Sequence, residues 1–560
     1  MSSNHIAVLE ATIMDNTSIP SSLQRRLIAS TVLAVALHHF VFKKGEWHLR
    51  APLILSIWLL SYPFLFLAEL TLGSKNFIGS GFNAILTLGC FTTVTFVSIA
   101  IYRIFFHQLS SFPGPRLAKV SKLWHFAQCW DGKNHLLLDD LHKKYGDFVR
   151  TGPNEITVFN PEGLLRLDGP GNRNTKSAWY DFLMPDVGVT TIRDKSFHDQ
   201  RRKIWVQALS GKALPFYEQQ MVDYTRKLDK LIQTASKNGS SVPFTSFVYW
   251  FSFDVMGMFS LSESFNMLHN ENWHYAIAHL RRAFALLGLL GPVPWLVHIA
   301  FKFLKGYWIV KDWHLTIDWC RDRMQKRIRA NDENLSIMSH LIADSRRKGS
   351  LEQDHHLLTG EAIVAIVAGS DTVASAMVFL FYELALNPSM ANKIYEELSA
   401  ISIQDFRALE RLPYYNAFIK ETTRLHPVVL TGGYRDLPPE GVTIAGRYIP
   451  GNTTVAAPRY TIFRSERCFE QADKFIPERW LSKPGMVKDS RSFVPFAQGR
   501  YTCVGKSLAL SELRVVAALL VSRYHIHLPP GDNGTRVEKD MQDQFTAKPG
   551  KLDLVFIPRD

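Results

Sequence analysis

The 560-residue sequence predicts a mainly α-helical protein with a small β region, preceded by N-terminal transmembrane helices. Apolar residues recur at helical spacing over long stretches, while strand-like runs are few and short. Three long apolar segments also stand near the N-terminus. The predicted helices of the main part cover residues 197–209, 215–235, 273–290, 313–330, 361–386, 391–400, 414–425 and 506–524. A short strand is predicted at 155–159, between two prolines, and others are expected after His426.

The N-terminal region is expected to lie in a membrane. Its apolar segments are Leu27–Phe42, Ala51–Gly73 and Phe82–Phe106. A helix needs about 20 apolar residues to cross a bilayer, so the second and third segments are long enough and the first is shorter. The sequence lacks a short apolar stretch and cleavage site before a polar chain, which disfavours a signal peptide. We expect a membrane region over residues 1–109, with two or three spans, and one further domain over residues 110–560.

Basic residues beside these segments predict how the chain is oriented. Lys43, Lys44 and Arg50 lie between the first two segments, and basic residues again follow the third. With three spans, this distribution places the N-terminus outside and the main domain in the cytosol. The sequon that begins at Asn16 then faces the lumen and is a candidate for glycosylation. With two spans, the N-terminus is cytosolic and the sequon is unused.

Composition narrows the classes of partner and of site. The net charge of +13 is compatible with nucleic acid, an anionic membrane surface or an acidic partner protein. The sequence has no dense Lys/Arg run, and its aromatic residues are spread through apolar stretches, so no nucleic-acid partner is expected. The five cysteines form no Cys-x-x-Cys pair and are odd in number, which disfavours a disulfide scaffold or a structural zinc site.

The predicted helix 361–386 is apolar on nearly every face, so it is either buried in a protein core or a fourth membrane span. In its middle, the run AGSDT at 368–372 places a carboxylate and a hydroxyl beside a glycine. An ionisable group in such a helix is costly and usually functional. Thr372 can donate to the carbonyl of Ala368, four residues earlier. We interpret Asp371 and Thr372 as candidate catalytic residues that deliver protons to a bound ligand.

The segment Phe493–Lys506 contains the strongest candidate for a metal ligand or a nucleophile. Cys503 lies in a glycine-flanked turn, and a helix begins at Lys506. Backbone N–H groups near that start would point toward the sulfur, so a lowered thiol pKa and a thiolate are expected. A buried structural cysteine is the alternative.

Two further motifs suggest a buried ion network. Glu421 and Arg424 are three residues apart on one helix face, and Arg479 follows within Pro477–Trp480. One glutamate held between two arginines would form a hydrogen-bonded cluster. The alternatives are a surface ion pair and a simple helix start at Pro477.

Together these segments resemble the cytochrome P450 superfamily of haem-thiolate monooxygenases. Four motifs stand in the order that the family shows, namely Ala-Gly-x-Asp-Thr, Glu-x-x-Arg, Pro-Glu-Arg-Trp and Phe-x-x-Gly-x-x-x-Cys-x-Gly. The resemblance covers roughly Phe112 to Pro558. It implies a cytochrome P450 fold for residues 110–560 and a haem b cofactor (iron protoporphyrin IX) with a cysteine thiolate ligand. The several apolar N-terminal segments resemble membrane-bound members from filamentous fungi that act in secondary metabolite biosynthesis.

The resemblance assigns a role to each candidate residue. Cys503 corresponds to the axial ligand of the haem iron, and Asp371 and Thr372 to the acid–alcohol pair that routes protons. The structural network behind the haem would consist of Glu421, Arg424 and Arg479. The remaining haem-binding residues implied by the family's pattern are His198, Arg202, Arg435, Phe496, Gly499, Tyr501 and Gly505.

One position departs from the family's pattern. Two residues before the cysteine, the family usually has arginine or histidine, which binds a haem propionate. Here that residue is Tyr501, and Arg500 stands one place earlier. Tyrosine can donate a hydrogen bond but brings no charge, so a charged propionate contact at this turn is in question.

The implied reaction inserts one oxygen atom of O2 into an apolar small molecule, with electrons from NADPH-cytochrome P450 reductase at the endoplasmic reticulum membrane. We expect the substrate pocket to be formed by residues before His198 and by segments 284–290, 365–372, 428–433 and 544–546. Two alternatives keep other functions open: a haem-thiolate isomerase or dehydratase, which needs no reductase, and a non-enzymatic membrane haem sensor.

Overall fold

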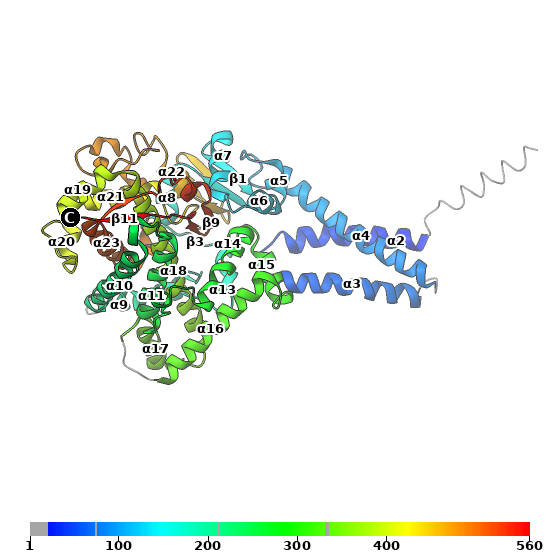
Figure 1. The fold of residues 1–560 in the computed structure, drawn as a ribbon. Coiled ribbons are helices and arrows are strands. Elements are labelled where there is room, and N and C mark those ends of the chain that lie inside the picture. Colours follow the sequence, from blue (N-terminus) through cyan, green and yellow to red (C-terminus); the bar gives the residue numbers. More distant parts are fainter. Residues whose placement is uncertain (1–20, 73–75, 211–212, 331–334, 560) are drawn as a thin grey trace, which may run out of the picture. The chain divides into compact units, whose positions relative to one another are not determined.

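The computed structural model describes residues 21–72, 76–210, 213–330 and 335–559. The chain divides into two compact units, Met1–Ser111 and Phe112–Asp560. Figure 1 labels their helices and strands and colours them along the sequence. The sequon at Asn16 lies outside the described residues.

The described part of the first unit consists of long apolar helices. They are α2 (Ser21–Leu37), α3 (Ala51–Leu72) and α4 (Phe77–Ile101), with π-helical turns at His38–Phe42 and Tyr102–Phe106. Each is long and apolar enough to cross a membrane, and few of its side chains are buried within the protein.

The first apolar segment is longer than its sequence suggested. It reaches 21 residues, Ser22–Phe42, because the helix begins before the apolar run and includes Arg26. The Nε of Arg26 lies 2.8 Å from a carboxylate oxygen of Glu69 on α3. This pair neutralises the charge that made the segment look shorter.

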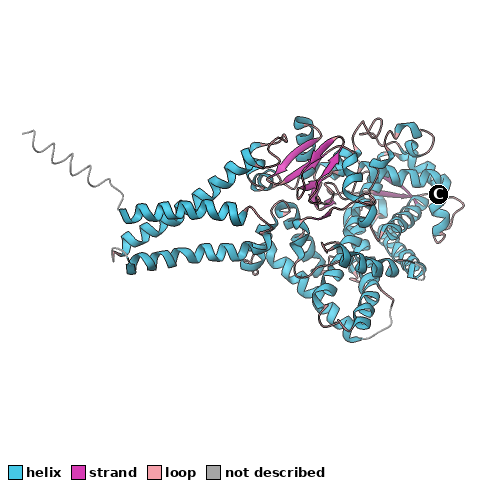
Figure 2. Cartoon of the chain, turned by 180° about the vertical axis from the view of Figure 1, so that it is seen from behind, coloured by secondary structure: helices cyan, strands magenta, loops and turns pink. Residues whose placement is uncertain are grey.

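The second unit is mainly helical with small sheets, which confirms the predicted fold class (Figure 2). Its longer helices are α7 (Asn134–Tyr145), α9 (Lys195–Ala208), α10 (Ala213–Ala235), α11 (Phe244–Leu261), α13 (Tyr275–Ala283), α15 (Pro294–Phe303), α16 (Trp308–Ala330), α17 (Ile337–Lys348), α18 (His355–Leu386), α19 (Pro388–Leu398), α21 (Pro413–Leu425) and α23 (Lys506–Arg523). Shorter helices are α5 (Arg116–Val120), α6 (Leu123–Gln128), α8 (Glu162–Asp168), α12 (Met267–Asn270), α14 (Ala285–Leu290), α20 (Phe406–Arg411), α22 (Arg459–Phe463) and α24 (Arg536–Lys539).

The strands of this unit form one five-stranded sheet and three two-stranded ones. The larger sheet has the order β1-β2-β7-β4-β3, in which β2 and β7 run parallel and the other neighbours antiparallel. Its strands are β1 (Phe148–Gly152), β2 (Glu155–Val158), β3 (Thr175–Lys176), β4 (Arg435–Asp436) and β7 (Thr454–Ala456). The two-stranded sheets pair β5 (Val442–Ile444) with β6 (Arg447–Ile449), β8 (Tyr524–His527) with β11 (Val555–Pro558), and β9 (Gln542–Gln544) with β10 (Thr546–Lys548).

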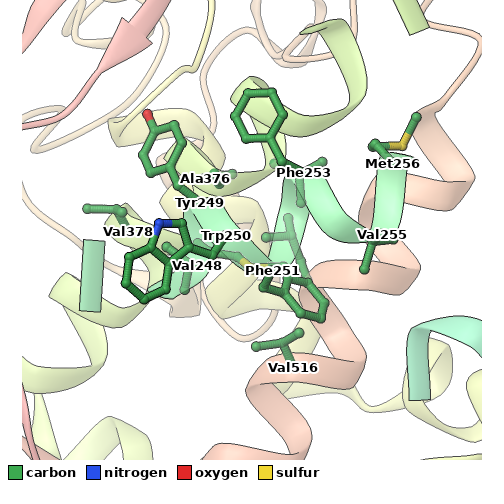
Figure 3. Close-up of a cluster of buried hydrophobic side chains, with 14 of the residues drawn as sticks. Val248, Tyr249, Trp250, Phe251, Phe253, Val255, Met256, Ala376, Val378 and Val516 are labelled. Carbon is green, nitrogen blue, oxygen red and sulfur yellow. The ribbon is translucent and has the colours of Figure 1, made fainter. Parts of the chain in front are cut away.

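The core of the second unit is built around α18, which packs on α11 and α23. Figure 3 shows side chains of α11, among them Phe251 and Phe253, beside Ala376 of α18 and Val516 of α23. In α18, 78% of the most apolar window is buried within the protein. Its length and apolarity are therefore explained by burial in the domain core, and not by a fourth membrane span.

The predicted helices differ from the observed ones in several boundaries, and α7, α15 and α17 were not predicted. The predicted helix 273–290 is divided at Phe284 into α13 and α14. Helix α23 ends at Arg523, because Tyr524 begins strand β8. Helix α11 was not predicted, because it is buried on nearly every side and so carries no polar face to mark its period.

Candidate functional site

A cavity of about 360 Å³ lies in the second unit beside the middle of α18. Its wall is mostly apolar and comes from segments that are far apart in the sequence. Phe182, Leu183 and Val189 contribute from the region before His198, as predicted. Residues of the predicted segments 284–290, 365–372, 428–433 and 544–546 also line it, so the segments expected to form the substrate pocket meet around one cavity.

Cys503 lies on the wall of this cavity, in the turn before α23. Its backbone N–H donates to the carbonyl of Phe496 over 2.9 Å, which closes the loop, and Phe496 itself lines the cavity. Gly499 has a φ of +61°, and a Cβ there would clash with the carbonyl oxygen of Asp168. A Cβ on Gly505 would meet nothing nearer than the Cys503 sulfur at 4.0 Å, so the space beside the sulfur is open.

The protonation of the Cys503 thiol differs from the prediction. Burial raises its pKa and outweighs the N–H of Gly505 and the charges of Arg202 and Lys506, each of which favours the thiolate. The predicted lowering of this pKa is therefore wrong for the free thiol, because the donors at the start of α23 do not replace the lost water. A metal cation bound to the sulfur would supply the missing stabilisation.

A group of basic side chains, which we call the basic cluster, lines one part of the cavity. It consists of Lys176, Arg202, Arg435 and Arg459. Strand pairing creates half of it, because β3 and β4 are antiparallel and Lys176 lies opposite Arg435. Among the described residues, one carboxylate comes within ion-pair distance of the cluster: Asp168, at 2.7 Å from Arg435 and 3.9 Å from Arg459. The cluster therefore carries an excess of positive charge.

Lys176 is the least compensated member of the basic cluster. Its side chain is buried, its Nζ donates to the carbonyl of Val189 over 2.9 Å, and burial lowers its pKa well below the usual value. It forms no ion pair with any residue that the structure describes. The Nζ lies 5.2 Å from the ring centre of Tyr501, and the Arg435 guanidinium lies 4.3 Å from the same ring. The Tyr501 hydroxyl is buried and has no hydrogen-bond partner within the described chain.

His198 and Arg202 are four residues apart on α9, and both reach the cavity wall. Burial lowers the pKa of His198 to about 4, so the imidazole is neutral at pH 7. Arg202 donates to the carbonyl of Thr502 over 2.6 Å and so ties α9 to the cysteine turn. Arg500 instead pairs with Asp199 and lies outside this cavity wall.

The predicted acid and alcohol of α18 point to different surroundings. Thr372 lines the cavity, and its hydroxyl donates to the carbonyl of Ala368 over 2.6 Å. Asp371 does not line the cavity, and its buried carboxylate accepts a hydrogen bond from the Thr546 hydroxyl. Burial raises the pKa of Asp371, against the opposing effect of that hydrogen bond. Thr546 is thus the only described hydroxyl bonded to this carboxylate.

Glu421, Arg424 and Arg479 form one cluster whose side chains are 0% exposed. One carboxylate oxygen of Glu421 accepts from Arg424 Nη2 at 2.7 Å and from Arg479 Nε at 2.9 Å. The other accepts from Arg424 Nε at 3.0 Å and from the Trp480 indole at 2.9 Å. The arginines also donate to backbone carbonyls, namely those of Phe463, Glu470, Gln471, Ala472 and Lys474. The cluster therefore fixes α21 against the chain that leads to the cysteine turn.

Lys176 and Arg459 were not named from the sequence, and Thr546 was predicted only as part of the pocket segment 544–546, without its contact to Asp371. None belongs to a motif that we recognised, and each reaches the cavity through contacts between distant segments. The register of β3 against β4 would have been needed to identify Lys176. The hydrogen bond between the β9–β10 hairpin and Asp371 of α18 would have been needed to find the contact of Thr546.

Comparison with known proteins places this site in a family. The family model described as "Cytochrome P450" matches residues 113–556. The cytochrome P450 monooxygenase FCK2 of Fusarium pseudograminearum is 34% identical over 541 residues, covering 94% of this chain and 97% of that protein. A tryprostatin B 6-hydroxylase of Neosartorya fischeri is 31% identical and covers 97% of this chain and 100% of that protein.

Solved structures share the fold of the second unit. The haem domain of cytochrome P450DA matches with a TM-score of 0.63 and 15% identity, covering 77% of this chain and 94% of that one. The retinoic acid-bound cyanobacterial CYP120A1 matches with a TM-score of 0.63 and 18% identity, covering 75% of this chain and 93% of that one.

Proposed function

The chain belongs to the cytochrome P450 family, and on this basis we propose that it is a membrane-bound monooxygenase that binds haem b through the thiolate of Cys503. The family match and the monooxygenase relatives make it a haem-dependent oxidoreductase that incorporates one oxygen atom of O2. The observation that carries the residue assignment is one cavity wall that joins Cys503, the basic cluster and Thr372.

The residues around this cavity fit haem b. The cofactor carries two propionates, and the basic cluster holds an excess of buried positive charge that two carboxylates would compensate. The buried Tyr501 hydroxyl, which lacks a partner within the described chain, could donate to one of them. The open space beside the Cys503 sulfur, left by Gly505, allows a planar group to approach. His198 and Arg202 complete the proposed haem-binding set, with Phe496 and Gly499 shaping the loop.

When bound, haem would supply the activation of dioxygen, for which thiolate ligation is well suited. The chain's own residues then bind, exclude water and move protons. Thr372 donates its hydroxyl hydrogen to Ala368 and so presents its oxygen lone pairs to the cavity as a proton relay. Asp371 lies beside it in the core, where burial raises the pKa of its carboxyl group and so makes it a better proton carrier near neutral pH than an exposed aspartate. The apolar wall keeps bulk water from these groups.

The cavity wall favours an apolar, at least partly aromatic substrate. Phe182, Phe284 and Phe545 line it, and most of the wall's surface is apolar. Relatives with the printed name tryprostatin B 6-hydroxylase occur in Aspergillus fumigatus and Neosartorya fischeri. We take this as support for an apolar secondary metabolite as the substrate, hydroxylated by this enzyme.

The proposed location is the endoplasmic reticulum membrane, with residues 110–560 in the cytosol and residues 1–109 as the membrane region. The helices of the first unit that are long and apolar enough to span a bilayer support this assignment. We propose NADPH-cytochrome P450 reductase on the same membrane as the electron donor. The net charge of +13 suits an acidic flavoprotein partner.

Microsomes that contain the full chain and this reductase are expected to oxidise a substrate only when NADPH is supplied. The experiment compares product masses by mass spectrometry with and without reductase, using extracts of candidate metabolites. A gain of one oxygen atom that depends on both additions supports the proposal. A product that forms at the same rate without reductase and NADPH contradicts it and favours an isomerase or dehydratase.

Replacing Lys176 with Met is expected to weaken haem retention. The side chains have similar length, but the substitution removes the buried ammonium that we propose to pair with a propionate. Loss of one partner of a buried ion pair costs about 3–5 kcal/mol, and tenfold corresponds to about 1.4 kcal/mol, so haem transfer to apomyoglobin should accelerate at least about tenfold. The matched control is Lys203→Met, an exposed lysine of α9, which should leave the transfer rate unchanged. Equal transfer rates in both variants and in the parent would remove Lys176 from the haem site.

A further inference from the structure

The carboxylate of Asp371 has no direct access to the cavity. It is buried in α18, whereas its neighbour Thr372 stands on the cavity wall. The described group that connects Asp371 to the cavity is Thr546, whose hydroxyl bonds the carboxylate and whose side chain lines the cavity. The half-buried Arg281 and Lys548 lie close enough to Asp371 for their charges to stabilise its ionised form. The acid therefore has two basic, partly exposed side chains and one cavity hydroxyl in its surroundings.

Thr546 belongs to a hairpin that contacts both the cavity and α18. Strands β9 and β10 pair Gln544 directly with Thr546, and Phe545 forms the turn with a φ of +74°. A positive φ is strained for a residue with a bulky side chain and persists where the surroundings enforce it. The Phe545 ring stacks on Trp179, with centroids 4.8 Å apart and an interplanar angle of 29°. The turn is thus fixed with its aromatic ring on the cavity wall.

A second hydrogen bond holds this hairpin on α18. The Ser375 hydroxyl lies 2.7 Å from the carbonyl of Ala547 and 2.8 Å from the carbonyl of Asp371. The backbone N–H of Ala547 also donates to the carbonyl of Val428 over 2.8 Å. Because the hairpin is held in place through its backbone, the Thr546 hydroxyl is not needed to attach it. Its bond to a buried carboxylate calls for another explanation.

We propose that Thr546 is a second proton-relay hydroxyl, through which Asp371 delivers protons to the cavity. This rests on the proposed monooxygenase function, since that reaction consumes protons. When Asp371 is ionised, Thr546 donates to it, as observed. When Asp371 is protonated, the acid donates to the Thr546 oxygen and the Thr546 hydrogen turns toward the cavity. When an oxygen acceptor in the cavity takes this hydrogen, the Thr546 oxygen takes the proton of Asp371, so the hydroxyl is restored and Asp371 is left ionised, ready to take up one proton from outside.

The number of protons that each reaction of O2 consumes predicts how the products would change if this relay were lost. Monooxygenation uses O2, two electrons and two protons, and places one oxygen atom in the substrate and the other in water. Without an organic substrate, NADPH reduces O2 either to H2O2, with two electrons and two protons, or to two waters, with four of each. A slower supply of protons from Asp371 lowers the share of water and raises the share of peroxide.

Thr546→Val tests the relay, because it keeps the shape of the side chain and removes the hydroxyl. The haem-loaded full chain with reductase and NADPH, and no organic substrate, is assayed for H2O2 formed per NADPH consumed. We expect at least about a twofold rise in Thr546→Val, with a larger solvent deuterium isotope effect on NADPH consumption. Thr546→Ser, which restores a hydroxyl, should return both values to those of the parent.

Ser375→Ala is the matched control, since it removes a bond between the same hairpin and α18 but keeps the Thr546 hydroxyl. It should speed hydrogen exchange of the amides in 545–548 and leave the peroxide share unchanged. If Thr546→Val does not retain haem, Thr546→Ala takes its place in the assay. Parent-like peroxide in the variant without the hydroxyl, or equal rises in the Val and Ser variants, would overturn the proposal. Neither outcome would contradict the proposed function. That function is tested separately, by the absorption spectrum of the carbon monoxide complex and by the product that forms only with NADPH.

Discussion

Cys503→Ser is expected to abolish the strongly red-shifted Soret band of the carbon monoxide complex, together with all oxygenated product. The thiolate ligand supplies the electron density that distinguishes haem-thiolate enzymes, and a serine hydroxyl cannot ionise comparably near neutral pH. The loop should keep its shape, because Cys503 is held through its backbone N–H to the carbonyl of Phe496. The spectral change would then report the loss of the ligand and not a loss of the fold.

The control for this substitution is Cys468→Ser. Cys468 is a buried free cysteine that lies outside the cavity wall, and burial raises its thiol pKa. This variant should keep the red-shifted band at the parental position and intensity per haem. A Cys503→Ser protein that keeps the band would remove Cys503 as the iron ligand. It would leave the membership of the family untouched, since that rests on the whole match over residues 113–556.

Glu421→Ala is expected to yield protein that is poor in haem and prone to aggregation. The substitution leaves the guanidinium groups of Arg424 and Arg479 buried without a counter-charge, and both are 0% exposed. Removal of one partner from a buried, hydrogen-bonded ion pair costs about 3–5 kcal/mol, which is a large part of the stability of a typical domain. The measurements are the haem-to-protein ratio after purification and the midpoint of thermal unfolding.

Glu440→Ala provides the comparison for an exposed ion pair. The Glu440 and Arg173 side chains are 49% and 74% exposed, and the Glu440 carboxylate lies 2.7 Å from the Arg173 guanidinium. Such pairs contribute about 0–1 kcal/mol, so this variant should match the parent in haem content and unfolding midpoint. If Glu421→Ala also matched the parent in both measurements, the cluster would be dispensable for the fold and for haem retention.

Local sequence was sufficient for the parts of the site that lie within one turn or one helix. Thr372 and Ala368 are four residues apart, so their hydrogen bond follows from helical geometry alone. Cys503, Phe496 and Gly505 likewise belong to one loop, whose spacing carries the information. The midpoint of α18 could also be placed, because its polar residues interrupt an otherwise apolar run.

The parts of the site that could not be predicted depend on contacts between residues far apart in the sequence. Lys176 meets Arg435 through a two-residue strand pairing, and so short a strand carries no periodic signal. Thr546 reaches Asp371 only because a hairpin is held on α18. The pKa of Cys503 was predicted in the wrong direction, because the cost of burial depends on the complete fold while the helix start is visible in the sequence.

The unbalanced charge around Tyr501 makes the amount of folded enzyme depend on cofactor supply. Until an anion compensates them, Lys176 and its three arginine neighbours oppose closure of the domain around the cavity. A ligand that binds only the folded state adds stability by mass action, about 1.4 kcal/mol for each tenfold rise in its concentration above the dissociation constant. Chains without haem are therefore expected to be less stable than haem-loaded chains and to be more exposed to degradation when haem is scarce.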